Sequence, residues 1–257
     1  MVPHGCIVCD VGCDHGYVPI YLAEHKICPK IIAMDVNEGP LMQAKEHIRA
    51  FALEEYIETR RSDGVGALGY EEADCLILAG MGGRLTVRIL TEGKEKIAAI
   101  KVLVLQPQSE ITLVRAFLRE RGYRIIHENM VYEDGKFYPM MKAVLCPADQ
   151  DCEKEQGHRS MPDRVSAHLS EERTKDMEKS ALLQQAYDRY GPCLLQSRHP
   201  VLYQFIRWEQ EREAAISRRI ESGAGRDDGA RRRRLEELAL SARIRDVALS
   251  FYAHGQT

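Results

Sequence analysis

The chain has 257 residues, enough for one large hydrophobic core and a smaller second unit. Its 36 basic and 39 acidic residues nearly cancel, so no global electrostatic field attracts nucleic acid or an anionic membrane. No stretch approaches 18 apolar residues, and no basic segment followed by an apolar one opens the chain. We therefore expect a soluble, cytoplasmic protein.

The eight cysteines do not form a metal-binding pattern. Cys6 and Cys9 have the CxxC spacing, but they lie within an apolar run whose alternation sends them to opposite faces. No second pair at zinc-binding spacing follows. We expect buried cytosolic thiols and no metal.

The first 146 residues alternate short β-rich runs with amphipathic segments. Apolar residues three and four apart predict helices over Gly39–Leu53 and Ile111–Arg121. This alternation predicts an α/β fold with a mostly parallel sheet covered on both faces. Only a Tyr-Glu-Asp-Gly turn separates the last two runs, which predicts an antiparallel hairpin at one edge of the sheet. The expected strands are Ile7–Val11, Ile31–Asp35, Ile57–Arg61, Cys75–Ala79, Val102–Gln106, Tyr123–Met130 and Phe137–Cys146.

The remaining sequence changes character after residue 147. Residues 148–180 are polar and poor in aliphatic side chains, so we expect a connector that leads into a helix. Two long helical patterns follow, at about His199–Glu221 and Ala230–Tyr252. The short glycine-rich stretch between them predicts an antiparallel helical hairpin. The expected domains are therefore 1–147, a connector over 148–180, and a hairpin unit over 181–257.

The stretch Cys-Asp-Val-Gly-Cys-Asp-His-Gly-Tyr-Val-Pro, residues 9–19, is placed where the first strand turns into its helix. Gly12 permits a sharp turn and a close approach to a ligand, and Gly16 permits close packing of the new helix. The dinucleotide fingerprint GxGxxG is absent, and so is the phosphate-binding GxxxxGK[ST]. Asp10 and Asp14 would repel a pyrophosphate, which disfavours a nicotinamide oxidoreductase, but they suit a cationic ligand such as S-adenosylmethionine.

The loops after the next three strands fit the same ligand. Asp35 stands where an acid accepts the ribose hydroxyls, and Asp63 could accept from the adenine amino group, although an Asp after a strand is often only a helix cap. The expected cofactor-binding residues are Asp10, Gly12, Asp14, His15, Gly16, Tyr17, Asp35, Val36, Asn37, Asp63, Gly64, Ala79 and Gly80.

Several strings together resemble the bacterial tRNA (adenine-22-N1)-methyltransferase family, the TrmK group. They include DVGCDHGYVPIYL, AMDVNEGPLMQAKEHI, LILAGMGG, VLQPQ and YGPCLL, and they span roughly Val8 to Leu195. The resemblance implies a Rossmann-like class I methyltransferase fold, a C-terminal antiparallel helical pair, and N1 methylation of an adenine in the D-arm region of tRNA. The resemblance implies a helix ahead of the first strand, whereas the sequence given starts almost on that strand, and Gln108 stands where the resemblance leads us to expect Asn.

This chemistry fits the loops. Adenine N1 carries an in-plane lone pair, so the enzyme must mainly align N1 with the methyl group and exclude water. Neither of the loops after the fourth and fifth strands contains the cysteine needed for C5 methylation of a pyrimidine, and the Asn/Asp-Pro-Pro-aromatic signature of exocyclic methylation is missing. The candidate catalytic residues are Gly80, Met81, Gly82, Gln106, Gln108 and Tyr138.

The target base must be unpaired, so a side chain should stack on it. Met81, Tyr138 and His15 are candidates. Alternatively, Met81 belongs to the core, Tyr138 is an ordinary strand tyrosine, and His15 bonds to the backbone of its turn.

Arginines at the hairpin tip are the candidate tRNA phosphate contacts, although a run of arginines is often only a solvated face. They are Arg218, Arg219, Arg226, Arg231, Arg232, Arg233 and Arg234. Two other functions stay open: methylation of another substrate, or RNA binding without catalysis. We expect a monomer, since no long heptad array is present.

Overall fold

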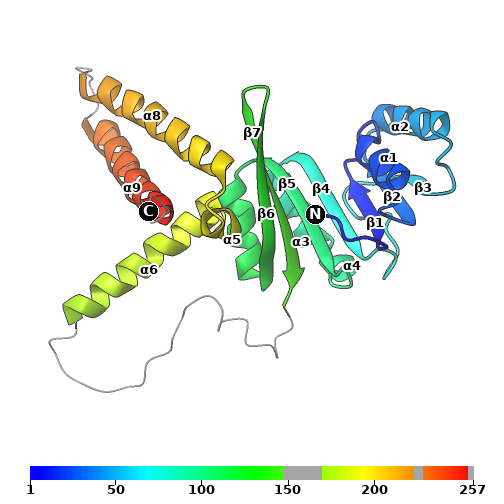
Figure 1. Ribbon diagram of the computed structural model, residues 1–257, viewed down its shortest axis with the longest axis horizontal. Coiled ribbons are helices and arrows are strands. Elements are labelled where there is room, and N and C mark those ends of the chain that lie inside the picture. Colours follow the sequence, from blue (N-terminus) through cyan, green and yellow to red (C-terminus); the bar gives the residue numbers. More distant parts are fainter. Residues whose placement is uncertain (147–169, 223–227, 254–257) are drawn as a thin grey trace. The chain divides into compact units, whose positions relative to one another are not determined.

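The computed structural model describes residues 1–146, 170–222 and 228–253 (Figure 1). It divides into two compact units, and each is described by itself. The first unit comprises Met1–Asn129 and Tyr138–Gln150; the second comprises Met130–Phe137 and Asp151–Thr257. In the described ranges, no helix combines the length and the apolar character that a membrane span requires.

A seven-stranded sheet with the order β3-β2-β1-β4-β5-β7-β6 organises the first unit. Strands β1 to β5 pair in parallel, and β7 pairs antiparallel to β5. All seven expected strands are present, but β4, β5 and β6 each run three residues further than expected. The strands are β1 (Ile7–Val11), β2 (Lys30–Asp35), β3 (Ile57–Arg61), β4 (Cys75–Gly82), β5 (Val102–Ser109), β6 (Tyr123–Glu133) and β7 (Lys136–Leu145).

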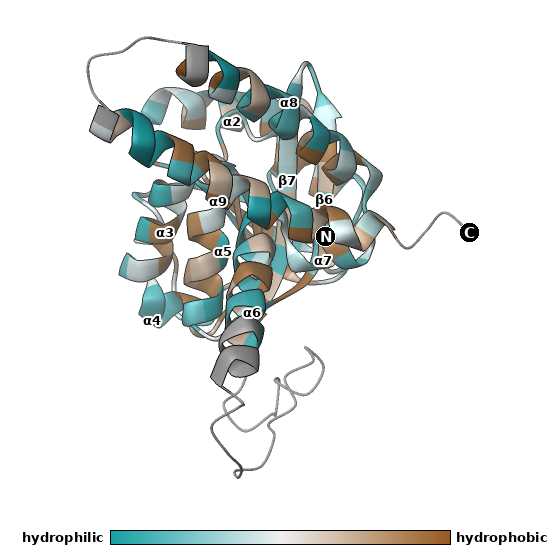
Figure 2. Cartoon of the chain, turned by 90° about the vertical axis from the view of Figure 1, so that its left-hand side faces the viewer, coloured by the Kyte–Doolittle hydropathy of each residue, from teal (hydrophilic) through white to brown (hydrophobic). Residues whose placement is uncertain are grey.

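Helices cover both faces of this sheet because its buried strands are apolar on both sides. Cys9 belongs to the core under α3 (Gly83–Glu92) and α5 (Ile111–Glu120), beside the short α4 (Lys94–Ile97). Figure 2 shows α3, α4 and α5 together on this face. Cys6 belongs to the opposite core, under α1 (Tyr17–Glu24) and α2 (Glu38–Ala50). The expectation that the two thiols point to opposite faces is confirmed.

The β6–β7 hairpin turns through two residues with positive φ, Asp134 at 48° and Gly135 at 76°. This is the backbone that a two-residue type I′ turn requires, which explains the Asp-Gly pair. The tip of the hairpin, Met130–Phe137, belongs to the second unit. Its residue Met130 packs in the same core as Tyr190, Leu194 and Leu202.

The second unit contains more helix than the sequence predicts. Its described helices are α6 (Ser170–Tyr190), α7 (Pro192–Gln196), α8 (Pro200–Ser222) and α9 (Asp228–Ala253). The antiparallel pair α8 and α9 is confirmed, and α6 also packs along α9 (Figure 1). The connector was expected to reach residue 180, but α6 begins at Ser170. Polar composition hid this helix, since its apolar contacts lie towards its C-terminal end, at Leu182, Ala186 and Tyr190.

Candidate functional site

Two buried carboxylates lie side by side at the carboxyl ends of β1 and β2. Asp10 is 3% exposed and Asp35 is 7% exposed. The Asp35 carboxylate accepts backbone N–H groups from Asp14 at 3.2 Å and from Asn37 at 2.8 Å. Neither Asp10 nor Asp35 takes part in an ion pair with any residue that the structure describes.

Burial, together with the smaller effect of the neighbouring charge of Asp35, raises the pKa of Asp10 to about 7. A carboxyl group with such a pKa is about half protonated, and so half neutral, near pH 7. A cation bound beside the pair would favour the ionised form. The arrangement therefore suits a ligand with a positively charged group.

The β1–α1 turn has the shape that its glycines predict. Gly12 has φ +76°, and a Cβ added there would lie 2.9 Å from Cε of Met81. Gly16 has φ +78°, and an added Cβ would lie 3.2 Å from Cβ of Ala44 on α2. Gly12 thus brings the first loop close to the loop after β4, and Gly16 lets α1 pack against α2.

The end of β4 is held by a side chain of β5. Gln106 Oε1 accepts the backbone N–H of Gly80 at 2.8 Å, where Gly80 has φ +78°. Because that N–H can only donate, the amide orientation is fixed, and Gln106 Nε2 is left buried without a hydrogen-bond partner in the described structure. The pairing of β4 with β5 shifts register on both sides of Met81. Such irregularities re-aim side chains at functional sites.

Of the remaining catalytic candidates, Gln108, Gly82 and Met81 lie at the ends of β4 and β5, and Tyr138 lies on β7. Gln108 Nε2 would lie 3.9 Å from a Cβ added at Gly80, and Gly82 precedes α3 as its N-cap. Met81 packs against the core below α3 and also approaches Gly12, and its stacking on the target base stays a prediction. Tyr138 is half-buried on β7. It lies on the strand face that also carries Lys142, the residue paired with Val104.

The loop after β3 joins the others through its backbone. Ser62 N–H donates to the carbonyl of Asp35 at 2.9 Å. One oxygen of Asp63 accepts from Arg88 at 3.0 Å. Asp63 and Gly64 line a cavity of about 250 Å³ together with residues of α3 and α4. Contacts of the backbone therefore bring the four loops together at the carboxyl ends of the strands, whereas the side chain of Asp63 faces Arg88.

A small aromatic group follows Asp14. His15 Nε2 is 3.6 Å from Asp14 Oδ1, and its buried Nδ1 has no hydrogen-bond partner in the described structure, so the expected bond to the turn backbone is not observed. Instead, Nδ1 of His47 donates a hydrogen bond to the backbone carbonyl of His15 at 3.0 Å. Tyr17 stacks on His47 with ring centroids 5.5 Å apart. Sequence reasoning missed His47, because a histidine inside a helix carries no local signal.

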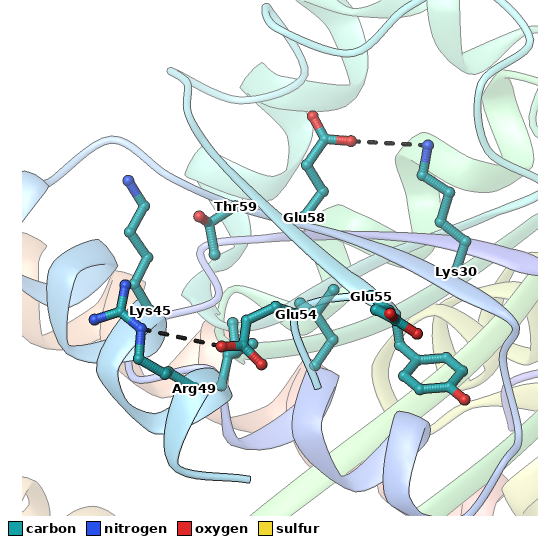
Figure 3. Close-up of a pocket in the computed structure, with 10 residues that line it drawn as sticks. Lys30, Lys45, Arg49, Glu54, Glu55, Glu58 and Thr59 are labelled. Carbon is teal, nitrogen blue, oxygen red and sulfur yellow. Dashed lines mark ion pairs between the residues drawn. The ribbon is translucent and has the colours of Figure 1, made fainter. Parts of the chain in front are cut away.

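A second pocket lies away from these residues, beside α2 and the edge strand β3 (Figure 3). It has a volume of about 470 Å³ and contains none of the expected site residues. Figure 3 shows its two ion pairs, Lys30 with Glu58 at 3.7 Å and Arg49 with Glu54 at 4.0 Å. Its charges largely neutralise one another.

The hairpin arginines lie on α8 and α9. Arg218 and Arg219 are exposed near the end of α8, and the four consecutive arginines occupy the beginning of α9. Arg232 pairs with Glu236 at 3.1 Å and Arg234 pairs with Glu237 at 2.7 Å. Arg226 lies outside the described residues.

Five cysteines of the described ranges are buried free thiols, namely Cys6, Cys9, Cys13, Cys28 and Cys75. No group of three or more His, Cys, Asp or Glu side chains is placed to hold a metal ion within those ranges.

Comparison with known proteins gives consistent matches. A family model described as "Methyltransferase domain" matches residues 1–141. The tRNA (adenine(22)-N(1))-methyltransferase of Bacillus subtilis (strain 168) is 34% identical over 142 residues, which are 55% of this chain and 60% of that protein. The chain thus spans about 60% of the length of the curated relatives it matches.

Solved structures extend the likeness over both units. The B. subtilis M1A22 tRNA methyltransferase TrmK has a TM-score of 0.74 at 27% identity, covering 96% of this chain and 94% of that chain. Streptococcus pneumoniae Sp1610 in complex with S-adenosyl-L-methionine has a TM-score of 0.68 at 28% identity, again over 96% and 94%.

Proposed function

The chain belongs to the methyltransferase domain family, and from this premise we propose that it transfers a methyl group from S-adenosylmethionine to N1 of an adenine in tRNA. The B. subtilis relative is named for position 22, and we propose the same position here. The observation that best supports the donor is the pair of buried carboxylates, Asp10 and Asp35, which no cation of the described chain neutralises.

The residues present fit this donor. Asp10 and Asp35 would face its ammonium group and ribose, and the oxygens of Asp35 are already oriented by two backbone N–H groups. Gly12 leaves open the space that a Cβ would fill next to Met81. Asp63 and Gly64 would hold the adenine ring. His15, Gly16 and Tyr17 shape the turn, whereas Val36, Asn37 and Ala79 complete the lining.

When bound, the donor supplies an electrophilic methyl group on a sulfonium sulfur. The chain's task is to hold the target adenine so that N1 faces that group, and to exclude water. Gln106 fixes Gly80 in its left-handed conformation, and this sets the position of Met81. The unpartnered Nε2 of Gln106 is available to donate to the bound base. Gln108, Gly82 and Tyr138 are the remaining proposed contacts.

Methylation makes the base cationic, so acceptors near it should stabilise the charge as it develops. The exposed backbone carbonyls of a glycine-rich strand end can serve in this way. The hairpin arginines would contact the tRNA backbone. A monomeric state and a cytoplasmic location stay predictions.

The test is to incubate the purified chain with radiolabelled S-adenosylmethionine and unmodified tRNA, then to digest the RNA and separate its nucleosides. We expect label in 1-methyladenosine, and none when the adenine at position 22 is replaced by guanine. Label in another nucleoside would show a methyltransferase of different specificity. Binding of tRNA without any label would favour the non-catalytic alternative.

A further inference from the structure

One stripe of α8 combines an aromatic ring with arginines. Trp208, Arg212 and Arg219 lie four and seven residues apart, which at 3.6 residues per turn puts them on the same side of the helix. All three side chains are exposed, and Trp208 is 46% exposed despite its large apolar area. A single exposed apolar residue would be ordinary, but exposed aromatic rings that cluster next to arginines form a surface suited to a ligand.

The ring of Trp208 packs against other aromatic rings of the second unit. It stacks on Phe205, with ring centroids 5.9 Å apart and an interplanar angle of 28°, and it lies 6.0 Å from Phe137 at the hairpin tip. Phe137 in turn lies 4.5 Å from Tyr132, which is 51% exposed. All these rings belong to the second unit. The indole is thus a fixed surface at the border of that unit's core.

The charges on α8 are sorted between its two sides. Glu209 and Glu213 turn inward, where both accept from Arg189. Arg212 turns outward, with its guanidinium carbon 5.3 Å from the centroid of the Trp208 ring. Arg212 forms no ion pair with any residue that the structure describes, and the exposed Glu211 lies beside the stripe. The outward side therefore presents a cation stacked on an aromatic ring.

We propose that Trp208 and Arg212 form a stacking platform for an unpaired base of the tRNA, with Arg219 contacting a phosphate beyond it. The proposal rests on the proposed function, since it names where that substrate is held. Flat aromatic and guanidinium surfaces bind splayed bases, whereas paired bases in a duplex offer no free face. The arginines add attraction for the backbone, which an apolar protein partner would not need.

The chain offers a direct probe, because Trp208 is its only tryptophan. Tryptophan fluorescence of the full chain is followed during titration with the tRNA, with a short unstructured RNA and with a blunt RNA duplex. We expect quenching by the tRNA and by the unstructured RNA, but little by the duplex. Unchanged fluorescence at tRNA saturation would overturn the proposal.

Variants supply the second arm. Trp208→Leu should weaken tRNA binding about tenfold, as loss of one stacked base does. Arg212→Gln should weaken it to a smaller extent. The matched controls are Tyr203→Leu, another half-exposed aromatic residue of α8 on a different side, and Arg207→Gln, an exposed arginine one residue from Trp208. Both controls should bind tRNA like the unmodified chain.

Folding and function are read separately. Circular dichroism and S-adenosylhomocysteine binding report whether each variant is folded. Equal tRNA affinities of Trp208→Leu and Tyr203→Leu, with the unmodified chain active, would refute the platform and leave the proposed function standing. If the unmodified chain neither binds nor methylates tRNA, the proposed function fails as well.

Discussion

At the scale of single residues, Gly12 offers a test of the donor site, because Gly5 provides a matched control. Both have φ near +77°, but a Cβ at Gly5 meets nothing within 4 Å, whereas one at Gly12 lies 2.9 Å from Met81. Each replacement by alanine should cost about 1–2 kcal/mol of stability through its backbone conformation. Only Gly12→Ala should also weaken S-adenosylhomocysteine binding, by about tenfold or more. Thermal unfolding and calorimetry measure the two effects, and equal donor affinities of the two variants would contradict the placement of the site.

Asp10 predicts a pH dependence of stability. Its pKa is about 7 in the folded protein against 3.8 for the free group, so the folded state binds this proton more tightly than the unfolded state. The stability that this provides is fully present below about pH 4 and is lost as the pH rises to about 7. The full difference is on the order of 4 kcal/mol. In Asp10→Asn that loss should vanish, so its stability relative to the unmodified chain should increase between about pH 5 and pH 8. Urea unfolding measures the free energy of unfolding of both chains at about pH 5 and about pH 8. The same difference between the two chains at both pH values would contradict this prediction.

The residues that could be predicted from sequence are those whose role is local. Gly12 and Asp10 belong to one turn, and their types alone indicate a tight bend beside an acid. The hydrogen bond from Gly80 to Gln106 could not be predicted, since it joins positions 26 residues apart and depends on a register shift. The contact of His47 with His15 depends in the same way on how α2 packs.

At the scale of elements, Glu213 ties together the three long helices of the second unit. It accepts from Arg189 of α6 and from Ser241 and Arg245 of α9. Glu213→Ala would leave both arginines partly buried without this carboxylate. We expect a loss of about 2–4 kcal/mol, because one partner of a buried pair is removed.

The control for this prediction is Glu236→Ala, which breaks an exposed pair within α9 and should cost less than about 1 kcal/mol. Denaturant unfolding followed by circular dichroism compares the two variants. A similar loss in both would mean that Glu213 does not organise the helices. S-adenosylhomocysteine binding should persist in both, since the donor residues belong to the first unit.

The elements differ in how well they could be predicted. The strands consist of alternating apolar and polar residues or of continuous apolar residues, and turn residues separate them. Their positions therefore follow from the sequence within a few residues. Helix α6 is polar over its N-terminal half, and its apolar contacts, at Leu182, Ala186 and Tyr190, lie in its C-terminal half, so no single period along the helix reveals it. The assignment of the β6–β7 tip to the helical unit follows from Met130 and Phe137, whose partners in the core are distant in sequence.

At the scale of the whole molecule, charge is distributed unevenly around a net value of only −3. The acids Asp10 and Asp35 lie at the proposed donor site of the first unit, whereas the arginine run lies at the hairpin of the second. A cationic donor and an anionic RNA would thus find complementary charge in different units. The net charge does not reveal this division, because the acidic and the basic residues cancel in the sum.

The arginine run makes a quantitative prediction about tRNA binding. Replacing Arg231 to Arg234 by glutamine should weaken binding and flatten its salt dependence, since each phosphate contact contributes roughly 0.7–0.9 to the slope of log affinity against log salt. The slope should fall by less than four such contributions, because Arg232 and Arg234 already pair with Glu236 and Glu237. Replacing those two glutamates by glutamine should act in the opposite direction and strengthen binding. Filter binding at several salt concentrations measures both, and an unchanged slope in the arginine variant would mean that the hairpin does not contact the RNA backbone.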